Sequence, residues 1–170
     1  MYEPREDSYL LQKHVEDTSG DVAIDMCTGT GIIAQTLTKT FDRVIGIDKD
    51  KESIQYASSN VENVVFWEHN LFPSHTPQAD LITCNPPYLP QSSLKDDELE
   101  SPQQGIQFSK TFLTQSKKYL KKNGTILLIL STQADKKTLL QHANTMYTYT
   151  KIDEVRAFFE KIQLYEFRHR

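Results

Sequence analysis

The sequence lacks the features that mark membrane-spanning proteins, secreted proteins and proteins that bind the phosphates of nucleic acid. No stretch approaches the roughly 18 consecutive apolar residues that a transmembrane helix needs, and the polar opening at residues 3–7 does not look like a secretory signal. Lys and Arg number 19 against 23 Asp and Glu, a balance that weighs against binding to nucleic acid through its phosphates. Of the two cysteines, neither has the Cys-x-x-Cys spacing of a metal site. We expect free thiols, no metal, and a cytoplasmic protein, with the nucleus as the alternative compartment.

Length and patterning favour a single α/β domain over residues 1–170. Short apolar segments alternate with segments of helical periodicity, and no linker, repeat or low-complexity segment interrupts them. A chain of this size can bury a core but leaves no room for a second substrate-reading domain. The expected strands cover residues 22–26, 43–48, 64–67, 80–84, 125–130, 147–155 and 161–168, and the sheet they form is expected to be mainly parallel.

The expected helix boundaries rest on capping residues. Asp7 or Ser8 is available as the N-cap of the first helix, and Gly20 follows its end. A helix from residue 108 to residue 120 is expected to end in a basic turn with Gly124 as its stop. Residues 91–104 are polar and acidic and predict a loop over the site.

The stretch from Asp80 to Tyr88 ends an apolar strand in a rigid polar tip. Pro86 and Pro87 stop the strand because neither can donate a backbone hydrogen bond. The residue before a proline is held in an extended conformation, which points the Asn85 carboxamide outward. The Asn85 oxygen and the Pro86 carbonyl can each accept one N–H, and Tyr88 offers a flat ring. This combination suits an NH2 group on a planar, conjugated system.

A second pattern lies in the first half of the chain. A short strand ends near Asp25, a glycine turn with Gly29 and Gly31 follows, and a helix then begins. This order is typical of a nucleotide-binding βα unit. Asp48 ends the next expected strand about 20 residues after the glycines, where such units place the carboxylate that holds ribose hydroxyls.

These motifs together resemble the class I S-adenosylmethionine-dependent methyltransferases that modify amino groups. The order is Asp25, the two glycines, Asp48 and then the Asn-Pro-Pro-Tyr tip, and the opening Tyr-Glu-Pro-Arg-Glu-Asp-Ser at residues 2–8 narrows the match. It is similar to the eukaryotic and archaeal branch of the HemK-like enzymes, which methylate a glutamine of the class 1 peptide chain release factor. The resemblance implies a Rossmann-like sheet of seven strands with an antiparallel closing hairpin and helices on both faces.

The resemblance also implies a site for S-adenosylmethionine. Asp25 would meet the amino-acid part of the cofactor, Gly29 and Gly31 would let the backbone come close, and Asp48 would accept both ribose hydroxyls. Cys27 stands where the family has its first glycine, so we expect a tighter pocket. An alternative for Asp48 is an ordinary acid that leads the next helix.

Two further pairs complete the implied cofactor site. Asn70 and Leu71 would flank the adenine, and Ser8 and Tyr2 would close the methionine side. The family has an acid where this chain has Asn70, so hydrogen bonding to the adenine amino group loses its charge assistance. The open alternatives are that Ser8 is a simple N-cap and that Tyr2 belongs to a loose terminus.

The implied chemistry needs no catalytic carboxylate. Asn85 and Pro86 would accept the two N–H groups of the glutamine amide, and Tyr88 would act with them in catalysis by packing against the amide plane. Pro87 would complete the substrate site, and Asn85 would also contact the cofactor. Such hydrogen bonds favour a pyramidal nitrogen with its lone pair aimed at the methyl carbon, so catalysis would be alignment and electrostatics.

The expected third strand implies a protein partner. It reads Val64, Val65, Phe66, Trp67, an apolar run without the lysine or proline that usually protects a sheet edge. The family resemblance implies a heterodimer in which a small zinc-binding activator adds a strand at this edge. The alternative is burial of this strand by the chain's own helices. We expect the isolated chain to be poorly soluble, co-expression to rescue it, and the rescue to fail when Phe66 or Trp67 is replaced by a charged residue.

Two other functions remain open on the sequence alone. The same tip serves adenine-N6 methyltransferases of DNA, because an adenine amino group is chemically like an amide, although such enzymes must flip a base and hold a duplex. The other is a non-catalytic scaffold that keeps the fold and binds a partner.

Overall fold

The computed structural model describes residues 3–87, 102–158 and 160–170, with side chains from residue 105 onward in the second range. The predicted site residues Tyr2 and Tyr88 lie outside the described residues. So do residues 91–101 of the expected acidic loop.

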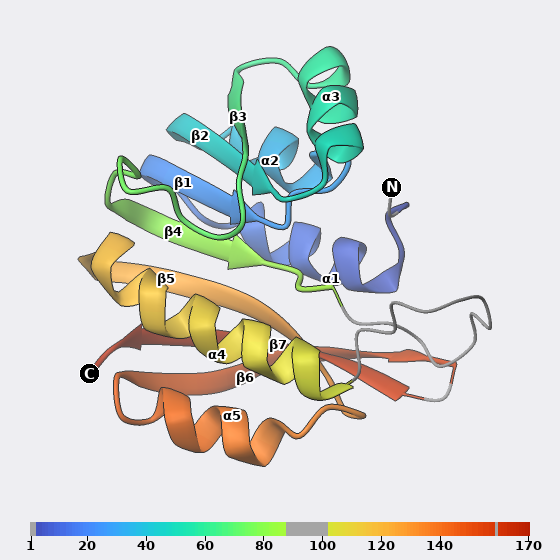
Figure 1. Cartoon of the computed structure of the whole chain (residues 1–170), viewed down its shortest axis with the longest axis vertical. Coiled ribbons are helices and arrows are strands. Elements are labelled where there is room, and N and C mark those ends of the chain that lie inside the picture. The colour runs from blue at the N-terminus through green and yellow to red at the C-terminus, as the bar shows by residue number, and fades with distance from the viewer. Residues whose placement is uncertain (1–2, 88–101, 159) are drawn as a thin grey trace.

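One sheet of seven strands organises the chain, in the order β3-β2-β1-β4-β5-β7-β6 (Figure 1). The first five of these strands run parallel, whereas β7 is antiparallel to both β5 and β6. The predicted mainly parallel sheet with an antiparallel closing hairpin is therefore confirmed. The strands are β1 Gly20–Met26, β2 Phe41–Asp48, β3 Val64–Glu68, β4 Ala79–Cys84, β5 Leu120–Ser131, β6 Tyr147–Ala157 and β7 Glu160–His169.

Helices cover both faces of the sheet. On one face, α1 and α2 pack over a core that includes Leu11, Leu37 and Leu81. On the other face, α4 and α5 pack over a core that includes Phe112, Leu139 and Ile82. Apolar side chains fill both cores because a central parallel strand is buried on its two faces. The helices are α1 Glu6–Val15, α2 Ile32–Leu37, α3 Lys51–Asn60, α4 Pro102–Tyr119 and α5 Lys136–Ala143.

The predicted N-cap of the first helix is wrong. The structure places Arg5 at the N-cap, without a capping side-chain hydrogen bond, and puts Asp7 and Ser8 inside the first turn. Both side chains are buried there. Gly20 lies in β1 rather than at the helix end, since α1 stops at Val15. The Asp7 and Ser8 side chains are therefore available for contacts across the fold.

The predicted end of the helix before β5 is also wrong. Helix α4 stops at Tyr119, and β5 begins at once with Leu120, which pairs with Ala79 across a register shift. Gly124 lies in this irregular part of the strand. A Cβ atom there would stand 2.7 Å from the Leu120 side chain and 3.0 Å from the Ala79 carbonyl oxygen. The glycine thus permits a close strand approach and does not cap the helix. At its other end, α4 begins at Pro102, inside the expected loop.

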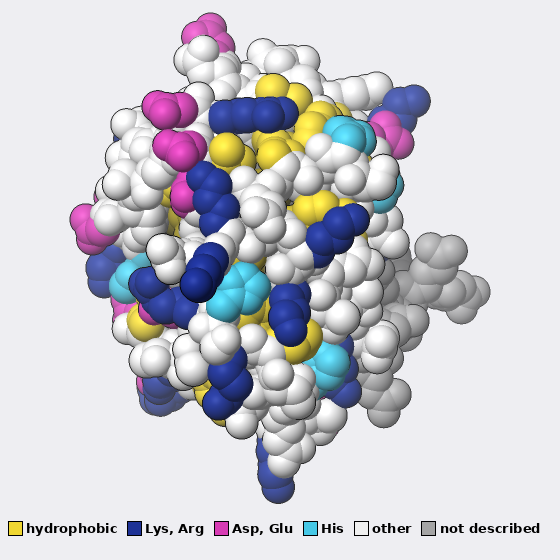
Figure 2. All heavy atoms as spheres, turned by 90° about the vertical axis from the view of Figure 1, so that its left-hand side faces the viewer, with side chains coloured by type: hydrophobic (Ala, Val, Ile, Leu, Met, Phe, Trp, Pro, Cys, Tyr) yellow, Lys and Arg dark blue, Asp and Glu magenta, His cyan; other side chains and the backbone are white. Residues whose placement is uncertain are grey.

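Basic side chains are spread over the face at the amino ends of the parallel strands, where acidic side chains gather toward one margin (Figure 2). On these amino ends, Lys121 forms ion pairs with Asp21 at 3.0 Å and with Asp80 at 2.9 Å. Part of the positive charge is therefore neutralised within the fold. Among the described helices, none combines the length and apolar character needed to cross a membrane.

Candidate active site

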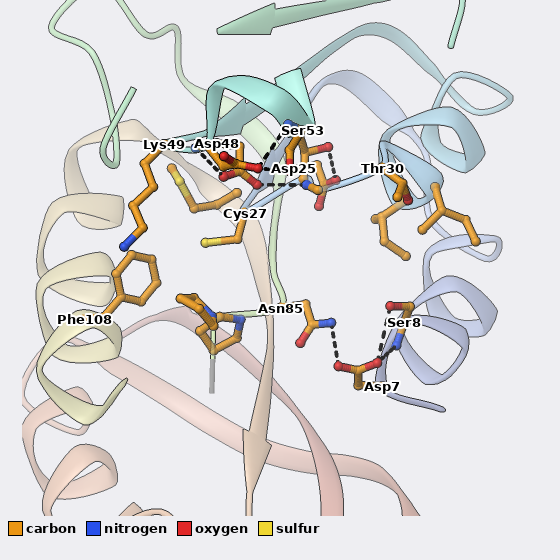
Figure 3. Close-up of a pocket in the computed structure, with 18 of the residues that line it drawn as sticks. Asp7, Ser8, Asp25, Cys27, Thr30, Asp48, Lys49, Ser53, Asn85 and Phe108 are labelled. Atoms are coloured by element: carbon orange, nitrogen blue, oxygen red, sulfur yellow. Dashed lines mark hydrogen bonds between the residues drawn. The ribbon is translucent and has the colours of Figure 1, made fainter. Parts of the chain in front are cut away.

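A cavity of about 520 Å³ opens at the carboxyl ends of β1, β2 and β4 (Figure 3). The strand order reverses between β1 and β4, and open α/β sheets bind ligands at such a switch point. The volume lies in the range of sites for small molecules and cofactors. Ten of the residues predicted for the site line this cavity: Ser8, Asp25, Cys27, Gly29, Asp48, Asn70, Leu71, Asn85, Pro86 and Pro87.

Gly31 is the N-cap of α2 and follows Thr30, which lines the cavity. It is absent from the cavity lining and packs behind the turn, where an added Cβ would stand 3.1 Å from Val61 and 3.2 Å from Phe66. Its φ of 82° is the left-handed conformation that glycine adopts without penalty. Gly31 therefore lets α3 and β3 pack closely against the turn that faces the cavity.

The turn after β1 carries two more left-handed residues. Gly29 has a φ of 54° and open space where a side chain would project, while Cys27 has a φ of 59°. This region carries a conformational cost for a cysteine. Figure 3 shows the Cys27 side chain directed into the cavity. The backbone at Cys27 thus keeps a glycine-like conformation, and the thiol occupies space inside the cavity.

Asp48 joins the glycine turn to the end of β2. Its Oδ2 accepts a hydrogen bond from the Gly29 N–H at 2.9 Å, and its Oδ1 accepts one from the Asp50 N–H at 2.9 Å. Asp50, not Asp48, caps α3, because its side chain accepts from the Ser53 N–H. Each Asp48 oxygen keeps a further lone pair. A pair of vicinal hydroxyls could donate to them without displacing the backbone donors.

Asp25 lies fully inside the fold at the end of β1. Its Oδ2 accepts from the Thr28 hydroxyl at 2.6 Å, and its Oδ1 accepts from the Thr83 hydroxyl at 2.7 Å. Burial raises the pKa of Asp25 from 3.8 to about 6, since desolvation outweighs these two hydrogen bonds, and the charge of Asp48 adds to the rise. The folded protein therefore holds a proton on Asp25 more tightly than the unfolded chain does. This contribution to stability is lost as the pH rises from about 4 to about 6.

The raised pKa predicts a pH dependence of cofactor binding. A cationic group bound near Asp25 favours its carboxylate form, whose share rises from about one tenth at pH 5 to about nine tenths at pH 7. We expect affinity for S-adenosylmethionine to increase about tenfold over this range, with proton release on binding near pH 6. Calorimetry in buffers of different ionisation enthalpy measures both quantities. A flat profile, or proton uptake on binding, would contradict a role for the Asp25 charge.

Asn85 follows β4 directly and lies between the cavity and α1. Its Nδ2 donates a hydrogen bond to Asp7 Oδ2 at 3.0 Å (Figure 3). Its Oδ1 is buried, and no described residue donates a hydrogen bond to it. Buried polar atoms without a partner are costly and uncommon in folded proteins. Because Asn85 also lines the cavity, a bound ligand could supply the missing group. Here the missing group is a hydrogen-bond donor.

The wall expected to meet adenine follows β3. Leu71 is buried with a φ of 63°, and its carbonyl lies 3.1 Å from the His69 Nδ1. Asn70, between them, is exposed on the cavity rim. Phe108 of α4 and Lys49 also line the cavity, and Figure 3 shows their side chains close to each other. The wall offers apolar surface and an amide, which suits a flat heteroaromatic ring.

Three residues of the site were missed by sequence reasoning. Asp7 was interpreted as a cap, and Thr28 and Thr83 were not singled out, although they hold Asn85 and Asp25 in place. A strand position paired with Asp25 would have pointed to Thr83 once the strand order was known. Asp7 belongs to the opening motif at residues 2–8, and Thr28 to the glycine turn, but neither motif indicates which side chain these residues contact.

Comparison with known proteins places this geometry in a family. Residues 6–158 match the methyltransferase small domain. A protein of Methanocaldococcus jannaschii, provisionally named a protein N5-glutamine methyltransferase, is 30% identical over 150 residues, which cover 81% of this chain and 75% of the relative. A release factor glutamine methyltransferase of Thermodesulfovibrio yellowstonii is 31% identical over 136 residues, or 69% of this chain, but only 48% of that relative.

A solved structure shares the fold over the whole length. It is a chain of the E. cuniculi Mtq2–Trm112 complex, described as responsible for methylation of the translation termination factor eRF1. The TM-score is 0.78 at 19% identity, with 99% of this chain and 98% of that chain covered. The family match extends from the first turn of α1 into the closing hairpin and includes every described residue of the cavity lining except Pro4. The chain belongs to the methyltransferase small domain family and is a class I methyltransferase that uses S-adenosylmethionine.

Proposed function

We propose that this chain transfers a methyl group to the side-chain amide nitrogen, N5, of a glutamine in the eukaryotic-type peptide chain release factor 1. Three findings support this substrate. The archaeal and bacterial relatives are named for glutamine methylation, and the solved complex is described as acting on the same class of factor. The single observation that carries the proposal is the buried Asn85 Oδ1, which has no donor among the described residues.

The cavity fits the cofactor on the chemistry of its lining. Asp25 offers a charge-bearing acceptor to the amino-acid part, and Asp48 offers two oxygens to the ribose hydroxyls. Leu71 and Phe108 offer apolar surface to the adenine. When bound, S-adenosylmethionine supplies an electrophilic methyl group on a sulfonium. The residues at the tip of β4 act on the other reactant.

The amide nitrogen is a poor nucleophile because its lone pair is delocalised into the carbonyl. Asn85 Oδ1 accepts one of its N–H groups, and the Pro86 carbonyl, which has no competing amide of its own, accepts the other. Two acceptors hold the nitrogen and favour a pyramidal geometry that frees the lone pair. Positioning then supplies most of the rate enhancement, and the surplus proton leaves once the nitrogen is alkylated.

Methyl-labelled S-adenosylmethionine tests the substrate directly. Purified release factor 1, duplex DNA and tRNA are incubated separately with the chain, co-expressed with a Trm112-type protein. We expect label in the release factor alone. Label in DNA or RNA would favour the adenine-N6 alternative, and no label in any substrate despite cofactor binding would favour a scaffold.

We further propose that a small zinc-binding activator subunit pairs with β3. This proposal is supported by the position of β3 at the sheet edge and by the likeness to a chain of the solved Mtq2–Trm112 complex. Val65 is 46% exposed on this strand. Phe66 faces inward instead, since a Cβ on Gly46 would stand 2.6 Å from its ring, and Trp67 packs against the core and the His75 ring. A strand from the partner would cover Val65 and satisfy the backbone edge.

The inward position of Phe66 and Trp67 makes Val65 the better test of this interface. Val65→Lys should lower the yield of soluble heterodimer at least about tenfold, because a charge at a covered edge blocks strand pairing. Ile152→Lys is the matched control, since Ile152 is 37% exposed on β6 at the opposite edge. Equal loss in both variants, or a soluble and active chain without the partner, would refute this interface.

A further inference from the structure

We propose that Asp7 is a positioning residue that fixes the orientation of the Asn85 carboxamide, so that its oxygen rather than its nitrogen faces the target amide. This inference rests on the proposed function. The first turn of α1, where Asp7 lies 78 residues from Asn85 in the sequence, would thus hold Asn85 in place during methyl transfer.

The two ends of a carboxamide have nearly the same shape but opposite hydrogen-bonding character. If Asn85 turned by half a rotation, its NH2 group would face the target NH2 group, and two donors would meet where one donor and one acceptor are needed. Nothing in the covalent geometry of asparagine prevents this rotation, because the terminal torsion is broad and roughly two-fold. A neighbouring group must decide between the two orientations.

The hydrogen bond to Asp7 fixes the orientation of the Asn85 carboxamide. Asn85 Nδ2 donates to Asp7 Oδ2 at 3.0 Å, and a carboxylate oxygen is an acceptor that cannot pair with the carboxamide oxygen in the same place. The carboxamide oxygen then lies on the other side, buried and without a donor among the described residues. A hydrogen bond to a charged acceptor is stronger than one between neutral groups, so a carboxylate strongly favours this orientation of the carboxamide.

The Asp7 carboxylate is itself held in place by α1. Its Oδ1 accepts from the Ser8 N–H at 2.6 Å and from the Ser8 hydroxyl at 3.3 Å, which leaves Oδ2 directed at Asn85. The residue is 4% exposed and lies in the first turn of a ten-residue helix, where the helix dipole favours negative charge. Helix α1 in turn packs on α2 and the sheet. The orientation of Asn85 is thus tied to the folded core.

Asp7→Asn separates this role from a general effect on the fold. The new carboxamide keeps an oxygen for the Ser8 N–H, but its NH2 group can donate to Asn85 Oδ1 and turn the amide the wrong way. We expect kcat for the release factor to fall about 100-fold, a loss typical of one misplaced polar contact in a transition state. The dissociation constant of S-adenosylmethionine should change less than about threefold, since Asn85 and not the cofactor is affected.

A double variant that exchanges the two residues tests the positioning role by rescue of activity. In the double variant Asp7→Asn with Asn85→Asp, the new amide on α1 donates to one oxygen of the new carboxylate that follows β4. The second oxygen of that carboxylate again accepts a hydrogen bond from the target amide. We expect the swap to recover at least about tenfold of the lost kcat at pH 8. Asn85→Asp alone places two carboxylates against each other and should stay below the swap. Asp135→Asn, at the N-cap of α5, is the control for loss of an acid at a helix start.

The outcomes distinguish this inference from the proposed function. No methylation of the release factor by the wild-type chain with its activator would contradict the proposed function itself. Wild-type activity together with a normal kcat in Asp7→Asn would overturn the positioning role. A swap no better than either single variant would do the same, because a purely structural role predicts no rescue. Rescue by the swap, with Asp135→Asn unchanged, establishes the role of Asp7.

Discussion

Asn85→Ala should abolish methyl transfer, with kcat at least about 1,000-fold below that of the wild-type chain. The substitution removes the buried Oδ1 acceptor, so the target nitrogen loses the contact that holds its lone pair toward the methyl carbon. It leaves Asp25 and Asp48, which are expected to hold the cofactor, untouched. Single-turnover kinetics with labelled S-adenosylmethionine measures the chemical step, and calorimetry measures the dissociation constant, which should change less than about threefold.

The matched control is Asn144→Ala at the C-cap of α5, away from the cavity lining. It removes the same side chain from the same domain and should leave kcat unchanged. Near-normal turnover in Asn85→Ala would remove the tip of β4 from the mechanism. A collapse of cofactor binding in this variant would give Asn85 a cofactor role in place of a substrate role.

Asp48→Ala should weaken S-adenosylmethionine binding by at least about 1 kcal/mol, because a charged acceptor serving two hydroxyls is lost. The structure adds a second cause. The Gly29 and Asp50 N–H groups both donate to this carboxylate, so the glycine turn and the start of α3 lose a shared anchor. The dissociation constant from calorimetry should therefore rise at least about fivefold.

Asp48→Asn separates the two causes. Its side-chain oxygen can still accept from Gly29, but it offers one fewer acceptor and no charge, so its affinity should fall between those of the wild type and Asp48→Ala. Asp42→Ala, exposed near the other end of β2, is the control on the same strand. Unchanged affinity in Asp48→Ala would mean that Asp48 holds the turn and no more.

The sheet could be predicted because a local sequence pattern marks each of its strands. Buried parallel strands read as short apolar runs, and the glycine turn and the double proline mark where two of them end. The carboxyl ends of parallel strands meet at one edge of a sheet. Asp25, Asp48 and Asn85 therefore come together, as their positions at or just after the strand ends suggested.

The missed contacts depend on long-range geometry. Asp7 meets Asn85 only because α1 lies beside the carboxyl end of β4, and Thr83 meets Asp25 only because β4 pairs with β1. A polar residue near a helix start is interpreted as a cap unless its distant partner is known. The prediction of the C-terminal end of α4 was wrong for a similar reason. Gly124 is needed for the approach of Leu120 to β4, and a glycine after a helical pattern looks the same in either case.

Fragment mass spectrometry of the release factor identifies the atom that this chain methylates. The factor is incubated with S-adenosylmethionine and the chain in complex with its activator, then digested and sequenced by fragmentation, with Asn85→Ala as the parallel sample. We expect one added methyl group on the side-chain amide of a glutamine, present with the wild-type chain and absent with the variant. A methyl group on a lysine, an arginine or the main chain, or an equal yield from Asn85→Ala, would contradict it.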